Sequence, residues 1–252
     1  MFNSKENITS VILAAGKGKR FGDQEKNKVT VELAGKPLIT WIVDHLEKAG
    51  LVNTIAVVGF AKESVQEALG ERVKYVVQEQ QLGTGHAVKV AFAEIDDNVE
   101  QVMVVSGDHG SFYTPEFFIR FLEEHKSQKN VLTLVTIKKD NPDELAWGRV
   151  IRNDRGLVVG VVEQKDATDK QRKIKELNAA LYVFDRKILE EALKTLQKHN
   201  TGEYYLPDVI DYCLEKNLKV GVVEAPERMA GFGINTKEQL EIAEKEFKKI
   251  YE

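Results

Sequence analysis

Hydrophobic positions in the first 140 residues fall into two alternating patterns. Short continuous apolar runs, of which Ile8–Ala14 is the first, are typical of strands covered on both faces. Between them lie segments with helical spacing, such as the one that begins at Pro37, a residue suited to a first helical turn, and stops at Gly50. Expected strands are 8–14, 54–58, 75–77, 101–106 and 131–137, and expected helices are 37–49, 62–69, 85–92 and 115–126. Repeated strand–helix units predict a Rossmann-like α/β fold, an open and mainly parallel sheet with helices on both faces.

The second half of the chain has a different pattern, richer in β-forming residues. Segments 148–153 and 157–163 are separated by a turn-like stretch, and a third β-rich segment covers 176–184. We expect these strands to form a small antiparallel insertion at one edge of the sheet. The remaining expected elements are helices 187–196 and 205–216, strand 219–223 and a charged terminal helix, 236–251. The chain contains no proline- or glycine-rich linker, which favours a single domain, 1–252, with two lobes.

Composition limits the possible classes of function. The formal charge of −4 argues against a protein that binds nucleic acid through non-specific attraction to phosphate. Cys213 is the only cysteine, so no internal disulfide or thiolate zinc cluster can form, and its helix-like surroundings suit a buried residue. The sequence shows no signal-peptide pattern and no apolar stretch of membrane-spanning length, so we expect a cytoplasmic protein without membrane contact.

A glycine-rich loop, VILAAGKGKRFG, follows the first expected strand. A Walker P-loop does not fit, because Gly16 and Gly22 are one residue too far apart and Asp23 stands where lysine is required. A dinucleotide-binding fingerprint does not fit either: Gly16 and Gly18 match, but the third glycine comes one position late.

Three cations crowd this loop, namely Lys17, Lys19 and Arg20. Open α/β sheets bind ligands at the carboxyl ends of their strands, which is where the loop lies. A solvated basic turn is the plain alternative. The concentration of charge favours a strongly anionic ligand, such as a nucleoside triphosphate whose polyphosphate is leaving.

At this point the chain resembles a known family. VILAAGKGKRF followed by KVTVELAGKPLI resembles the signature of sugar-nucleotide pyrophosphorylases. Further matches follow in the family's order: QEQQLGTGHAV, SGD, WGRVIRND, VEQKDATDKQRKIKE, TGEYYLPDVI and GIN. Together they resemble the uridyltransferase domain of the bacterial bifunctional N-acetylglucosamine-1-phosphate uridyltransferases/glucosamine-1-phosphate acetyltransferases.

The resemblance implies a fold of the nucleotide-diphospho-sugar transferase type and a Mg²⁺-dependent enzyme. Its substrates would be UTP and N-acetylglucosamine 1-phosphate, and its products UDP-N-acetylglucosamine and pyrophosphate. Residues 8–140 would bind the nucleotide, residues 141–235 the sugar, and 236–252 would form a C-terminal helix. A pyrophosphorylase for another sugar 1-phosphate, such as glucose 1-phosphate, and a non-catalytic nucleotide-sugar sensor are the alternatives.

The resemblance also assigns residues to the phosphates. Arg20 would hold the leaving phosphates with support from Lys17, and Lys28 would bridge the reacting ones. Asn27 replaces the family's usual proline, so Lys26 competes with Lys28 for that role. The backbone that would lie against base and ribose is formed by Leu13, Ala14, Ala15 and Gly16.

Other matched positions would contact the base, the metal and the sugar. Gln78, Gly83 and Thr84 would recognise uracil, while His86 is expected to pack or cap rather than to catalyse. Asp108 and Asn235 would hold Mg²⁺, a cation that commonly takes few protein oxygens alongside phosphate and water. The remaining substrate-binding positions are Ser106, Gly107, Gly148, Glu163 and Asn178.

Departures from the family pattern gather on the sugar side. Ser106 replaces a tyrosine, Trp147 stands for an aromatic residue that is usually tyrosine, and 109–111 replaces a valine–proline stretch. Ala179 and Ala180 stand where the family has threonine–glycine. The chain also lacks the hexapeptide repeats of an acetyltransferase β-helix, so we expect a stand-alone uridyltransferase or an excised domain, with no oligomeric state implied.

Overall fold

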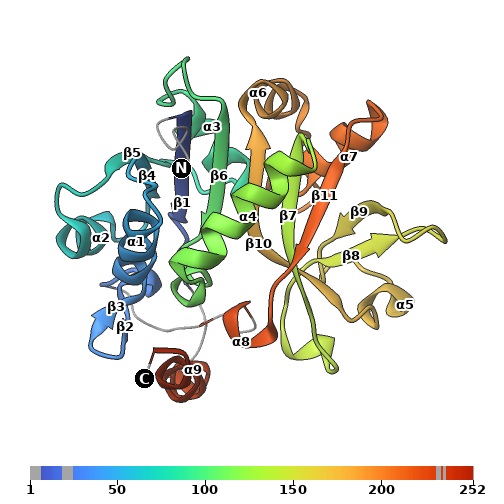
Figure 1. Cartoon of the computed structure of the whole chain (residues 1–252). Coiled ribbons are helices and arrows are strands. Elements are labelled where there is room, and N and C mark those ends of the chain that lie inside the picture. The colour runs from blue at the N-terminus through green and yellow to red at the C-terminus, as the bar shows by residue number, and fades with distance from the viewer. Residues whose placement is uncertain (1–6, 19–24, 231–233, 235–236, 252) are drawn as a thin grey trace.

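The computed structural model describes residues 7–18, 25–230, 234 and 237–251. Its main sheet has the strand order β11-β7-β10-β6-β1-β4-β5 (Figure 1). These strands are β1 (Ile8–Ala14), β4 (Thr54–Val58), β5 (Lys74–Val77), β6 (Gln101–Ser106), β7 (Leu132–Lys138), β10 (Glu176–Asp185) and β11 (Val220–Glu224). β1 pairs in parallel with β4 and β6, so the carboxyl ends of these three strands meet at one edge.

Helices cover both faces of this sheet, as the sequence pattern predicts (Figure 1). One face carries α1 (Leu38–Lys48), α2 (Lys62–Leu69) and α4 (Pro115–Ser127), and the other carries α3 (Thr84–Phe92), α6 (Arg186–Thr195) and α7 (Asp208–Glu215). Successive residues of a strand point to opposite faces. Ile12 therefore joins the core under α1, whereas Val11 joins the core under α3.

The third β-rich segment is central, not peripheral. β10 runs antiparallel between β6 and β7, with Tyr182 opposite both Val104 and Leu134. Only β8 (Arg149–Arg152) and β9 (Val158–Val162) form the expected antiparallel insertion, which joins β10 where Arg149 pairs with Leu177. The expectation that all three strands lie at the edge was wrong for β10, because burial on both faces looks the same in a sequence whichever way a strand runs.

Several elements were not expected from the sequence, because they are too short to show a period of hydrophobic residues. They are β2 (Glu32–Leu33), β3 (Lys36–Pro37), α5 (Asp169–Arg172), α8 (Glu227–Ala230) and the 3₁₀ turns Lys28–Thr30, Gly110–Phe112 and Pro142–Glu144. α7 begins at Asp208, three residues later than expected, with Pro207 at its N-cap. Cys213 lies on this helix and is fully buried, as expected.

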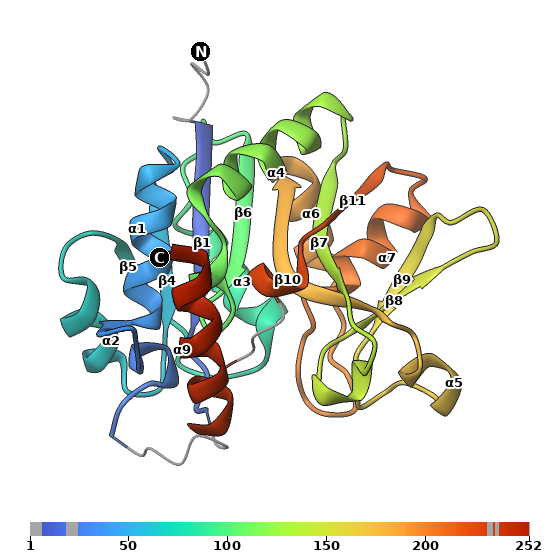
Figure 2. The same ribbon diagram turned by 60° about the horizontal axis from the view of Figure 1, so that its bottom comes forward.

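The terminal helix α9 (Lys237–Tyr251) lies across the end of the molecule near β2 (Figure 2). Its Phe247 packs against Trp41 of α1 and Phe112, which extends the hydrophobic core to the C-terminal helix. Within the described part of the chain, no helix is both long and apolar enough to span a bilayer.

Candidate active site

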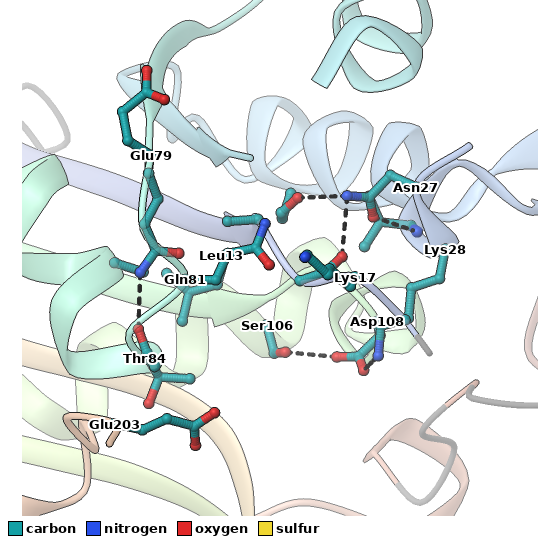
Figure 3. Close-up of a pocket in the computed structure, with 18 residues that line it drawn as sticks. Leu13, Lys17, Asn27, Lys28, Glu79, Gln81, Thr84, Ser106, Asp108 and Glu203 are labelled. Atoms are coloured by element: carbon teal, nitrogen blue, oxygen red, sulfur yellow. Dashed lines mark hydrogen bonds and ion pairs between the residues drawn. The ribbon is translucent and has the colours of Figure 1, made fainter. Parts of the chain in front are cut away.

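A cavity of about 760 Å³ opens at the carboxyl ends of β1, β5 and β6. Figure 3 shows Lys17, Lys28 and Asp108 toward one end of it and Glu79, Thr84 and Glu203 toward the other. The sequence-predicted residues that line it are Leu13, Ala14, Ala15, Gly16, Lys17, Lys28, Gln78, Gly83, Thr84, Ser106 and Asp108. Residues far apart in the chain thus meet at the edge where an open α/β sheet binds ligands.

Asp108 is the hydrogen-bonding centre of the cationic end. Its Oδ2 forms an ion pair with Lys28 Nζ, and its Oδ1 accepts a 2.6 Å hydrogen bond from the Ser106 hydroxyl. Burial alone would raise the pKa of Asp108, but the charges of His109 and Lys28 and these hydrogen bonds together hold it well below its usual value. The carboxyl group is therefore ionised across the physiological range and offers oxygen ligands to a cation.

Lys28 reaches Asp108 because the preceding residue is anchored. Asn27 is fully buried, and its Nδ2 donates to the carbonyls of Ala14 at 2.9 Å and Phe60 at 2.8 Å. These bonds join the loop after β1 to the loop after β4, and a proline at this position has no amide to donate. The structure thus gives a role to the departure from the family pattern, which sequence reasoning noticed but did not explain.

Between the two competing lysines, the structure distinguishes clearly. Lys28 lines the cavity and pairs with Asp108, whereas Lys26 is exposed and is not among the lining residues. Lys28, the residue favoured by the resemblance, is therefore the one that lies at the cavity, while its role toward the phosphates stays a prediction.

The opposite end of the cavity is formed by the loop between β5 and α3. Gln78 is 4% exposed, and its Nε2 donates to the Gly83 carbonyl at 3.1 Å and lies 3.0 Å from His86 Nδ1. Burial lowers the pKa of His86, with a further contribution from the charge of Lys89. His86 contacts Gln78 from behind and does not line the cavity, as expected of a packing residue.

A segment from the second half of the chain supports this loop. Gly85 N–H donates to Tyr204 O at 2.9 Å, and Leu206 N–H donates to Thr84 Oγ1 at 3.0 Å. Glu203, beside Tyr204, lines the cavity. Sequence reasoning quoted TGEYYLPDVI only as a family motif and assigned no residue of it to the site.

A second cavity of about 190 Å³ adjoins the first. Gly148, Glu163 and Asn178, the three positions assigned to the sugar, all line it. It shares Leu13, Thr84, Ser106 and Asp108 with the larger cavity. The two cavities therefore meet at the Asp108 carboxylate.

Polar groups in the second cavity are held in a low-dielectric setting. Asn178 Nδ2 donates to the Tyr182 hydroxyl at 2.5 Å, and burial raises the pKa of Tyr182. Burial also raises the pKa of Glu163. His109 and Trp147 complete one wall, with ring centroids 4.4 Å apart, and both belong to the stretches that depart from the family pattern.

Gly107 lines neither cavity. Its N–H donates to Leu13 O at 3.0 Å, and a Cβ there would lie 2.8 Å from the same oxygen, so glycine permits β1 and the end of β6 to approach. Arg20 and Asn235, expected at the phosphates and the metal, lie outside the described residues, as does Lys19.

Asp108 could contribute to a metal site at the junction of the cavities. Its carboxylate oxygens are hard donors of the type that Mg²⁺ prefers. The described residues contain no group of three or more His, Cys, Asp or Glu side chains arranged to hold a metal ion. Mg²⁺ in proteins commonly takes further oxygen ligands from bound phosphates and water.

Comparisons with known proteins agree with this arrangement. The family model described as nucleotidyl transferase matches residues 9–227. Proteins named "Bifunctional protein GlmU" from Acetivibrio thermocellus and an Exiguobacterium species are 39% and 42% identical over 236 residues, which is 93% of this chain. The match covers 50% and 51% of those relatives, so the chain spans about half their length.

A solved structure shares the fold at lower sequence similarity. A UDP-glucose pyrophosphorylase complexed with UDP-glucose superposes with a TM-score of 0.77 at 18% identity, over 96% of this chain and 98% of that one. This likeness confirms the predicted open, mainly parallel α/β architecture.

Proposed function

Because the chain belongs to the nucleotidyl transferase family, we propose that it transfers UMP from UTP to N-acetylglucosamine 1-phosphate and releases pyrophosphate. The observation that carries this proposal is the pair of adjoining cavities that meet at Asp108. The larger offers the cations Lys17 and Lys28 together with the loop from Gln78 to Thr84, and the smaller offers amide, carboxyl and hydroxyl groups suited to a sugar. The motifs of the uridyltransferase family and the relatives named bifunctional protein GlmU support the choice of substrates.

The chemistry requires alignment rather than a nucleophilic side chain. A phosphate oxygen of the sugar 1-phosphate attacks the α-phosphorus of UTP, and the bond from that phosphorus to the bridging oxygen breaks. The electron pair leaves with pyrophosphate, and no proton has to be removed from the attacking oxygen. Catalysis then depends on positioning the two anions and on stabilising the charge that develops on the leaving group.

The described residues supply these functions from fixed positions. Lys28, held by Asn27, faces the junction of the cavities and would neutralise charge on the reacting phosphates. Lys17 lies in the loop after β1, where it would contact the polyphosphate. We propose the same leaving-group role for Arg20, since a guanidinium forms paired hydrogen bonds with phosphate oxygens.

We further propose that the enzyme uses Mg²⁺, held by Asp108 and Asn235. The ionised, partly hydrogen-bonded carboxylate of Asp108 fits a hard cation of this kind. When bound, Mg²⁺ supplies positive charge to the phosphate oxygens.

Gln78, Gly83 and Thr84 would hold the uracil, with the backbone from Leu13 to Gly16 against base and ribose. Gly148, Glu163 and Asn178 would hold the sugar and its acyl group. Ser106 keeps Asp108 oriented through its hydroxyl.

The test is release of pyrophosphate from UTP with Mg²⁺ and a panel of sugar 1-phosphates. N-acetylglucosamine 1-phosphate is expected to be the best acceptor. Asp108→Asn keeps the size of the side chain but removes its charge, and it should lower kcat by about 100-fold or more. Asp140→Asn is the control, because Asp140 is exposed, lines neither cavity and pairs with the exposed Lys175, and it should leave turnover unchanged.

Each other outcome would change the proposal. Faster release with glucose 1-phosphate would retain the reaction and replace the sugar. No release with any sugar would favour a nucleotide-sugar sensor, and full activity of Asp108→Asn would remove Asp108 from the reaction.

A further inference from the structure

The side chain of His86 lies beside the proposed base-binding end of the cavity, in contact with Gln78. It lies on the first turn of α3 and lines a separate cavity of about 340 Å³, together with Tyr204. It therefore stands behind Gln78, with its Nδ1 3.0 Å from Gln78 Nε2. A residue in this place acts on a bound base only through Gln78.

The hydrogen bonds define which way the Gln78 amide points. The Gly83 carbonyl can only accept, so the group 3.1 Å from it is the amide nitrogen. The second hydrogen of that nitrogen is then directed to His86 Nδ1, which must accept it and carry no proton. The lowered pKa of His86 favours this neutral form.

With both amide hydrogens engaged, the oxygen is the group of Gln78 left for a ligand. Gln78 lines the 760 Å³ cavity, and no hydrogen bond joins its oxygen to any described residue. An acceptor at this place complements the ring N–H of uracil. Cytosine has an acceptor at the same ring position, so it would face an oxygen with no hydrogen between them.

We infer that His86 is a positioning residue for base selection, which occupies the second amide hydrogen of Gln78 and thereby excludes cytosine. This inference rests on the proposed function, since it concerns the same nucleotide site. Without His86, the amide would be held by the single bond to Gly83, and it could rotate so that its nitrogen, in place of its oxygen, faces a cytosine acceptor. With His86 in place, the site selects uracil in two ways: the amide oxygen of Gln78 accepts from the uracil ring N–H, and no free N–H of Gln78 is left to donate to cytosine.

Two substitutions separate the hydrogen bond from the packing. His86→Phe keeps a ring that can pack against Tyr204, whose ring centroid lies 6.4 Å from that of His86, but it has no acceptor. His86→Asn places a carbonyl oxygen near the position of Nδ1 and so retains an acceptor. Both variants are compared with the wild type for equilibrium binding of UTP and of CTP with Mg²⁺, a readout that does not need turnover.

We expect the preference for UTP over CTP to fall by about tenfold in His86→Phe, the size of one hydrogen bond, and to be largely kept in His86→Asn. Gln78→Ala should lower the same ratio, and adding His86→Phe to Gln78→Ala should change it no further. Thermal unfolding of each variant shows whether a loss of binding reflects a loss of folded protein. If His86→Phe does not fold, His86→Leu takes its place against His86→Asn.

Two results would overturn the inference alone: an unchanged ratio in His86→Phe, or an equal change on the Gln78→Ala background. If either result is found and the wild type still binds UTP more tightly than CTP, the proposed function stands. A wild-type protein that binds neither nucleotide would overturn the proposed function, and the inference with it.

Discussion

Among single residues, Ala180 has a backbone conformation that suits glycine better than alanine. Its φ is +51°, in the left-handed region, and the register of β10 against β7 shifts between Asn178 and Tyr182. The irregularity directs this part of β10 into the smaller cavity, which Ala180 helps to line. The family that the chain resembles has glycine here, so the alanine retains the bulge at some cost in backbone energy.

Ala180→Gly is expected to stabilise the protein by up to about 1 kcal/mol. The left-handed conformation costs alanine about 1–2 kcal/mol, while glycine loses about 0.5–1 kcal/mol more chain entropy on folding. Ala179→Gly is the matched control: this neighbour is fully buried without positive φ, so its loss should destabilise by about 1 kcal/mol. Urea unfolding of both variants measures the change in unfolding free energy. If both substitutions changed it in the same direction, the argument would be wrong.

At the scale of elements, the loop that we propose binds the base depends on a segment from the other half of the chain. Residues 82–85 and 204–206 exchange hydrogen bonds through Leu82, Thr84 and Gly85. Gly83 lies at their closest approach, with φ of +94°. The loop that would contact uracil is therefore shaped by a segment about 120 residues away.

Gly83→Ala should weaken both folding and UTP binding. A Cβ at this position would lie 2.5 Å from Tyr204 O and 2.9 Å from Glu203 Cβ, so the two segments must separate. We expect a loss of about 1–3 kcal/mol in unfolding free energy and a clear rise in the KM for UTP.

Gly70→Ala is the control for this prediction. Gly70 also has positive φ, at +57°, but a Cβ there meets nothing within 4 Å. It should lose only the backbone strain of alanine at this φ and ψ, about 1–3 kcal/mol, and bind UTP as the wild type does. A normal KM in Gly83→Ala would show that docking of the two segments does not shape the site.

The same scale shows what the sequence could predict. The period of apolar residues located every long strand and helix, because burial of one or both faces leaves a direct trace in the sequence. The central place of β10 left no such trace, since strand order depends on pairing between distant segments. Two-residue strands and single turns, such as β2 and α5, were missed for lack of length.

Prediction of the candidate site divides in the same way. The cluster of cations after the first strand indicated Lys17, whereas Lys28 and Asp108 were assigned through the resemblance to the family. The anchoring of Lys28 by Asn27 and the contact of His86 with Gln78 depend on which side chains meet in the folded chain. Neither could be derived from spacing.

Across the whole molecule, the buried histidines of helices α1 and α4 are held in the neutral form. His45 on α1 is 1% exposed and His125 on α4 is 2% exposed. Burial lowers the pKa of each from 6.5 to about 4. His125 Nδ1 also lies 2.8 Å from the Thr133 hydroxyl, which fixes its ring.

These histidines link the stability of the fold to pH. Above pH 6.5 both are neutral whether the chain is folded or unfolded, so neither contributes a pH dependence. Between pH 6.5 and about 4 the unfolded chain binds protons that the folded chain excludes, so stability falls as the pH falls. By pH 5 each histidine should cost about 2 kcal/mol.

Other groups titrate in this range, so the prediction concerns a difference between proteins. His125→Asn keeps a polar group near Thr133 but has no proton to gain, and it should lose about 2 kcal/mol less than the wild type between pH 7 and pH 5. His45→Asn should show the same difference, because burial lowers the pKa of both histidines to about 4. The two sites lie on different helices, so their effects should be additive. Urea unfolding at both pH values measures the four free energies of each comparison. An equal fall in wild type and variants would show that the folded protein binds these protons, and that the histidine pockets admit water.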